Sequence, residues 1–121
     1  MATPSEVTLT IAATSGFLES RVIVEYRAEF TQDEINGNVG SLEVVQLFGE
    51  DPPAGPAGDD LLFTFFPIRI IRPDGQTARQ ISRSAVVPNV VLDEDPGILE
   101  DEIYARVRLG LNSARSGIVS T

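Results

Sequence analysis

Cysteine, histidine, tryptophan and lysine are all absent from this chain. Without cysteine there is neither a disulfide nor a thiolate nucleophile, and without lysine there is no amine to form a Schiff base. Without histidine the chain lacks the usual general base near neutral pH. A pair of carboxylates could still hydrolyse a glycoside, but the missing tryptophan removes a ring on which sugars commonly stack. We therefore expect a protein that is not an enzyme.

Basic residues are few and of one kind. All nine are arginines, against 18 aspartates and glutamates, which gives a formal net charge of −9 at pH 7. Nucleic-acid binding depends on neutralising phosphates with basic side chains, and anionic lipid headgroups repel an acidic surface in the same way. We therefore expect neither nucleic acid nor a membrane as partner, and instead a cation or a basic protein surface.

Long apolar runs are absent as well. No stretch reaches the roughly 20 apolar residues that cross a bilayer, and the residues from Met1 to Glu6 contain neither the basic nor the apolar part of a signal peptide. We expect no transmembrane segment, no signal peptide and synthesis in the cytoplasm, which leaves the final location open, a virion included. With 121 residues, no internal repeat and no linker, the chain fits one domain over 1–121.

Alternation of apolar and polar residues is the main pattern that the chain does contain. It is clearest over residues 21–30, where every second residue from Val22 to Phe30 is apolar, as in a strand that is buried on one side. Alternation or a short apolar run predicts further strands at residues 6–13, 41–48, 61–72, 77–84, 86–92 and 103–111.

Turn and loop signals separate these strands. Residues 31–40 are polar, and residues 50–60 hold three prolines and two glycines, so both are predicted loops. Pro67 removes a ladder donor inside its run, which predicts an edge strand, a bulge or a strand that changes sheets. The residues from Pro73 to Gln76 form a predicted turn that we expect to close a hairpin between the strands on either side.

Residues 98–111 fit two structures. Leu99, Ile103, Val107 and Leu111 keep the spacing of a helix, and Pro96 could open it. Apolar and other residues also alternate without a break over 103–111, as in a strand. We expect the strand, because the rest of the chain is β.

About seven strands separated by short turns predict an all-β fold, an antiparallel β-sandwich. Asp101, Glu102, Ile103 and Tyr104 stand before an alternating strand, and this arrangement resembles the tyrosine corner of immunoglobulin-like domains. The resemblance implies an immunoglobulin-like topology as one arrangement of the strands. It concerns the fold alone, since a fold does not imply a function.

Acidic residues gather in the predicted loops. If successive strands simply reverse direction, the loops at 31–40 and 93–102 lie at the same end of the sandwich. Asp33, Asn36, Asp93 and Asp95 could then meet there, and calcium is bound by about six to eight oxygens of this kind. The other interpretation is that acidic side chains keep the loops solvated, and that Asp and Asn serve as turn residues.

A surface for partners is predicted between residues 63 and 83. Adjacent Phe65 and Phe66 must point to opposite faces of a strand, so one of them is expected at the surface. Arginines on both arms of the predicted hairpin would form a basic stripe on an acidic protein, which favours association. Core packing and a solvated face are the other interpretations of these residues. The predicted interface residues are Phe63, Phe65, Phe66, Arg69, Ile71, Arg79 and Arg83.

The function that these patterns favour is that of a non-catalytic structural or interaction module without a cofactor. We expect it to self-associate as a subunit of a larger assembly, of the virion, tail or surface-fibre type. The alternative is a calcium-dependent binding module whose ligands come from the acidic loops. A third interpretation is a sandwich that binds carbohydrate or lipid.

Overall fold

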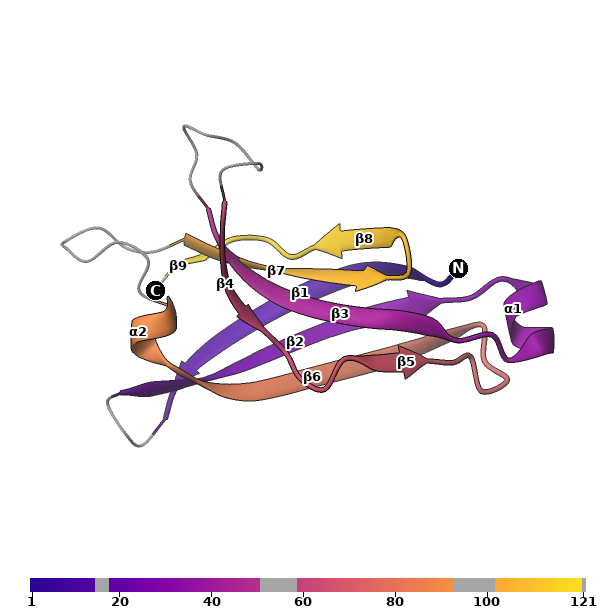
Figure 1. Ribbon diagram of the computed structural model, residues 1–121, viewed down its shortest axis with the longest axis horizontal. Coiled ribbons are helices and arrows are strands. Elements are labelled where there is room, and N and C mark those ends of the chain that lie inside the picture. The colour runs from indigo at the N-terminus through magenta and orange to yellow at the C-terminus, as the bar shows by residue number, and fades with distance from the viewer. Residues whose placement is uncertain (15–17, 51–58, 93–101, 121) are drawn as a thin grey trace.

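The computed structural model describes residues 1–14, 18–50, 59–92 and 102–120. These residues form strands joined by turns and two short helices (Figure 1). The helices are α1 (Gln32–Gly37) and α2 (Asn89–Leu92). The strands are β1 (Thr3–Ala13), β2 (Glu19–Glu29), β3 (Ser41–Gly49), β4 (Asp60–Thr64), β5 (Arg69–Ile71), β6 (Ala78–Pro88), β7 (Glu102–Leu109), β8 (Asn112–Arg115) and β9 (Val119–Ser120).

The strands form two sheets that pack face to face, as Figure 1 shows. The first sheet has the order β1–β2–β6. In the second sheet β3 and β7 are central, β4 and β5 both pair with the outer side of β3, and β8 and β9 both pair with β7. Every pairing is antiparallel. The predicted antiparallel β-sandwich is therefore confirmed.

The strand order is also compatible with an immunoglobulin-like topology. When β4 and β5 count as one interrupted strand, and β8 and β9 as another, seven strand positions result. The first, second and fifth then lie in one sheet, and the third, sixth and seventh lie in the other, as in immunoglobulin domains. The fourth position is joined to the third here, because both β4 and β5 pair with β3.

Strand alternation determines which side chains enter the core. On β2 the side chains of Val22, Val24, Tyr26 and Ala28 are fully buried, while the residues between them are exposed or half-buried. On β7 every second residue from Ile103 to Leu109 is fully buried. The strand prediction for this segment is thus confirmed over residues 102–109, and the helical alternative is wrong there.

Two connections differ from the predictions. The segment after Thr31 was expected to be a loop, but it contains α1, which begins with a capping box formed by Thr31 and Glu34. The turn from Pro73 to Gln76 does not close a hairpin, since β5 pairs with β3 whereas β6 pairs with β2. All eleven residues of β6 find partners on β2, so the turn carries the chain from the second sheet to the first.

The predicted strand at 86–92 is only partly present. β6 continues to Pro88, and the following four residues form α2 instead of a strand. Proline can end a strand at a sheet edge because it has no N–H to donate. Figure 1 places α2 at the end of the sandwich opposite to α1.

Candidate functional site

Four polar side chains meet between the two sheets. Glu43 of β3 is fully buried and accepts hydrogen bonds from the Tyr26 hydroxyl of β2 and from Arg83 Nη1 of β6. Arg69 Nε of β5 donates to the same carboxylate over 2.9 Å. The network therefore joins β2 and β6 of the first sheet to β3 and β5 of the second sheet.

The buried charge of Glu43 is balanced within this network. Two guanidinium groups, those of Arg69 and Arg83, form ion pairs with it, and a buried carboxylate is tolerated only when it is paired in this way. Burial raises the pKa of Tyr26, and its hydrogen bond to Glu43 raises it further. These groups bond to one another, so the network joins the two sheets through their interior.

The same network fixes the segment between β4 and β5. Arg83 uses its second amino group, Nη2, to donate to the carbonyl oxygen of Pro67 over 2.9 Å. Since Arg83 is itself buried against Glu43, Pro67 is held at a defined distance from β6. The residues on either side of it, Phe66 and Ile68, are presented to solvent by this anchored segment.

Large exposed apolar side chains follow this edge of the second sheet. Phe66 is 74% exposed, and the other members are 42–56% exposed. Leu42 and Ile70 are directly paired neighbours on β3 and β5, and so lie on the same face. We call this set the apolar edge: Leu42, Leu61, Phe66, Ile68 and Ile70.

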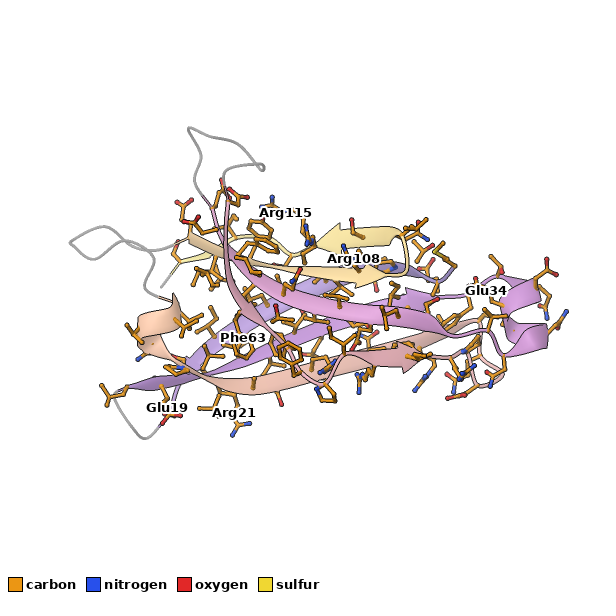
Figure 2. All side chains as sticks on the ribbon, viewed as in Figure 1. Glu19, Arg21, Glu34, Phe63, Arg108 and Arg115 are labelled. Carbon is orange, nitrogen blue, oxygen red and sulfur yellow. The ribbon has the colours of Figure 1, made fainter. Side chains whose placement is uncertain are left out.

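A groove of about 490 Å³ runs beside the apolar edge, between β4 and β6. Figure 2 shows Phe63 of β4 in the space between the two sheets. Its ring meets that of Phe65 edge to face, with 5.2 Å between the ring centroids. The groove is lined by Leu61, Leu62, Phe63, Thr64, Phe66 and Ala85. Its wall is thus mainly apolar and continuous with the exposed side chains of the apolar edge.

The predicted interface residues separate into four groups in the structure. Phe65 and Ile71 are buried in the core. Arg69 and Arg83 are engaged by Glu43 and do not form a free basic stripe. Arg79 donates to the carbonyl oxygen of Arg72 over 2.7 Å and lies 3.4 Å from Asp74.

The remaining two predicted interface residues lie at the surface feature itself. Phe63 lines the groove and Phe66 belongs to both the groove and the apolar edge. Phe65 is buried and Phe66 exposed, as expected for one of the two, although both residues follow the end of β4 at Thr64 and strand alternation is not the cause. Sequence reasoning did not single out Leu42, Leu61 or Ile68. Of the adjacent Ile70 and Ile71 it selected Ile71, which is buried, whereas Ile70 is the exposed one.

The predicted calcium ligands are only partly described. Asp33 and Asn36 are exposed on α1, where the Asn36 side-chain oxygen accepts a hydrogen bond from Gln32 over 2.8 Å. Asp93 and Asp95 lie outside the described residues. Within residues 1–14, 18–50, 59–92 and 102–120, no three acidic side chains are grouped so that they could hold a metal ion.

The loops at 31–40 and 93–102 were expected at the same end of the sandwich. This placement is wrong for the described residues that border 93–101. α1 precedes Ser41, the first residue of β3. Glu102 adjoins Ile103, which pairs with Gly49 at the last residue of β3. Leu92 is the last residue of α2, which directly follows Pro88, and Pro88 pairs with Glu19 at the start of β2. In contrast, α1 follows the end of β2. The residues that border 93–101 are therefore at the opposite end of the sandwich from α1.

A second surface lies on the outer face of the second sheet. The rings of Phe48 and Tyr104 are directly paired across β3 and β7 and stack with 5.6 Å between centroids. The Arg106 guanidinium lies 4.6 Å from the centroid of the Phe48 ring, and that of Arg115 lies 3.7 Å from the centroid of the Tyr104 ring. Such cation–π contacts attract the guanidinium groups to the faces of the rings.

Tyr104 does not form the tyrosine corner that its sequence context resembles. Its hydroxyl donates to the carboxylate of Asp59 over 2.7 Å, whereas the tyrosine corner bonds to the backbone a few residues upstream. Burial, followed by this hydrogen bond and the charge of Asp59, raises the pKa of Tyr104 to about 12. The positive charges of Arg115 and Arg106 oppose the rise.

Comparison with known proteins adds no relative. No protein-family model matches the sequence, and no curated protein matches it either. Among the described residues, no helix has both the length and the apolar character needed to cross a membrane.

Proposed function

We propose that this chain is a non-catalytic interaction module that self-associates through its apolar edge, as a subunit of a larger assembly. The observation that supports this is the concentration of exposed apolar side chains on β3, β4, β5 and the segment between β4 and β5. Clustered exposed apolar groups on a soluble protein mark association surfaces, whereas scattered ones need no explanation. A virion, tail or surface fibre is the setting in which we place such an assembly.

Local charge supports association of two copies at this edge. The whole chain carries −9, so two copies repel one another at most orientations. Residues 60–72 contain only one acidic residue, Asp60, against Arg69 and Arg72. The apolar edge is therefore a part of the surface with little acidic charge of its own, where self-repulsion is reduced and burial of apolar area is favourable.

Rigidity of the edge is the second supporting feature. Association is weakened when side chains and loops must be ordered during binding. The Arg83 bond to the Pro67 carbonyl and the ion pair between Arg69 and Glu43 already order the segment that carries Phe66 and Ile68. Little further ordering is then needed when a second copy docks.

Light scattering on the full chain over a range of protein concentrations tests this proposal. We expect a molar mass that rises above the 13.0 kDa of one chain as the concentration increases. Phe66→Ser and Ile70→Ser should shift the rise to higher concentration, because each removes apolar area from the contact. Leu111→Ser, a matched change at a side chain 83% exposed in the β7–β8 turn, should leave it unchanged. A mass of 13.0 kDa at every concentration would contradict the proposal.

A further inference from the structure

Three of the nine arginines share the outer face of β7 and β8. Arg106 and Arg115 are direct cross-strand partners, and Arg108 follows two residues along β7, paired with Ser113. Figure 2 shows Arg108 and Arg115 on the same side of the molecule, beside these two strands. We call Arg106, Arg108 and Arg115 the arginine face.

This arrangement is unfavourable for the fold itself. Like charges directly opposite one another on neighbouring strands destabilise a sheet, and Arg106 and Arg115 are such a pair. The stacked rings of Phe48 and Tyr104 hold the two guanidinium groups but do not neutralise them. A ligand with negative charge would relieve the repulsion.

This positive charge is only partly balanced within the described residues. Glu50 lies 3.6 Å from Arg115, and Arg106 donates to the neutral side chain of Gln46 over 2.8 Å. Arg108 is exposed and makes no ion pair or side-chain hydrogen bond with another described residue. Two carboxylates lie near the three guanidinium groups, that of Glu50 beside Arg115 and that of Asp59 at the Tyr104 hydroxyl, on a protein whose overall charge is −9.

The arginine face also borders a hollow. Its volume is about 300 Å³, and it is lined by Phe48, Tyr104, Arg106, Ser113, Ala114 and Arg115. A guanidinium fork carries five N–H donors. Arg106 and Arg115 lie over the rings and each uses one amino group within the fold, on Gln46 and on Glu50, so both guanidinium groups keep N–H donors for a carboxylate. Because the rings already hold them in place, binding costs little side-chain entropy.

The spacing of the arginines indicates the shape of the ligand. Residues two apart on one strand face lie about 6.6–6.8 Å apart, and this is the separation of Arg106 and Arg108 along β7. An extended peptide places its own alternate side chains at the same interval. We propose that the arginine face binds an extended acidic peptide segment with carboxylates on alternate residues.

The charge of the rest of the surface favours a peptide over a larger polyanion. Nucleic acid or an anionic membrane is large enough to interact with the charge of the whole protein, and a net charge of −9 repels it. A short peptide interacts mainly with the charges beside its binding site, because salt screens charges beyond about 8–10 Å. The inference does not depend on the self-association proposed above, since it concerns other residues and another partner.

Fluorescence anisotropy of labelled peptides with the full chain at low salt tests the inference. The probe is a peptide in which glutamate alternates with threonine. One control peptide has glutamine at each glutamate position, and another has the same glutamates in one block. We expect the alternating peptide to bind most tightly, the blocked peptide less tightly and the glutamine peptide not at all. High salt should abolish the binding.

A matched pair of variants locates the site. Arg108→Gln removes an exposed guanidinium that makes no ion pair or side-chain hydrogen bond with another described residue, so the domain should fold normally. It should weaken peptide binding about three- to five-fold, the effect of one exposed ion pair. Arg21→Gln makes the same change on the outer face of the first sheet, where Figure 2 shows Arg21, and should have no effect beyond that of net charge.

Three results would overturn the inference. The first is that the alternating peptide does not bind the wild-type chain at low salt. The second is that Arg21→Gln weakens binding as much as Arg108→Gln, which would mean that the attraction is not localised. The third is that short DNA or anionic vesicles bind as tightly as the peptide, which would assign the face to a different class of ligand.

Discussion

Glu43 is a carboxylate on the inward face of a central strand, and its partners come from three other strands. Tyr26 and Arg83 reach it from the first sheet, and Arg69 reaches it from β5. Removing one member of a buried ion pair is costly because the other charge is left buried without a partner. Single residues in this network should therefore decide the stability of the whole sandwich.

Glu43→Gln tests that expectation. The change keeps the shape of the side chain but leaves the buried guanidinium of Arg83 unpaired, so we expect a loss of about 3 kcal/mol in the free energy of unfolding. Chemical denaturation followed by circular dichroism measures it. Glu25→Gln, an exposed change on β2, should alter stability by less than about 0.5 kcal/mol. Equal stability of the two variants would show that the network does not anchor the sheets.

The two tyrosines give a pH prediction. The pKa of Tyr104 is raised to about 12, and burial raises that of Tyr26 as well. In the unfolded chain both ionise near pH 10. A raised pKa means that the stabilisation is complete below about pH 10 and is lost as the pH rises through the folded value.

Ultraviolet absorbance of tyrosinate measures this directly. We expect almost no tyrosinate in the folded protein at about pH 10.5, and about three-quarters of both tyrosines ionised at that pH in denaturant. Tyr104→Phe should remove the ionisation that occurs near pH 12 in the folded protein. Ionisation of either tyrosine near pH 10 without unfolding would contradict the described environments.

At the level of elements, the long alternating strands could be predicted and the short elements could not. β2 and β7 have one face in the core, so the burial pattern is already present in the order of residues. β8 and β9 have four and two residues, and they are strands only because β7 offers a partner. The direction of the turn between β5 and β6 was missed for the same reason, since pairing with β3 is a long-range property.

α1 was missed although its signal is local. Thr31 and Glu34 have the spacing of a capping box, and both of its hydrogen bonds form, over 2.8 and 3.3 Å. Burial alone would raise the pKa of Glu34, but the hydrogen bonds from Thr31 help to hold that pKa below its ordinary value. Asn38 ends the helix in the left-handed conformation.

Thr31→Ala should destabilise this element. Loss of an N-cap side chain typically costs about 1 kcal/mol, and thermal or chemical denaturation measures it. Thr31→Ser keeps the hydroxyl that accepts from the backbone N–H of Glu34, so it should retain most of the stability. If the two variants lose the same amount, the capping hydrogen bond is not what stabilises α1.

Across the whole molecule, the second sheet carries both of the surfaces that we assign to partners. The apolar edge lies on its β4–β5 side, and the arginine face lies on its β7–β8 side. The sequence pointed to an exposed phenylalanine beside Pro67 and to a local excess of arginine, but it placed the basic stripe on residues 69–83. Arg69 and Arg83 are instead paired with Glu43, which is 26 and 40 residues away in sequence.

Added calcium distinguishes the proposed function from the calcium-dependent alternative. A ligand that binds only the folded state raises stability by mass action, by about 2.7 kcal/mol at a concentration a hundred times its Kd. On the function proposed above, we expect the same melting temperature with added calcium and with EDTA. A higher melting temperature with calcium would favour the alternative, a calcium-dependent binding module, and Asp93→Ala with Asp95→Ala would then show whether those two residues are ligands.

Hydrogen exchange of the full chain at a low and a high protein concentration tests self-association at the place where we expect it. Backbone amides become protected when they are buried between copies. We predict slower exchange at high concentration in peptides that cover residues 61–71, with unchanged exchange in β1 and β8. Identical exchange at both concentrations, or protection confined to strands away from the apolar edge, would contradict the proposal.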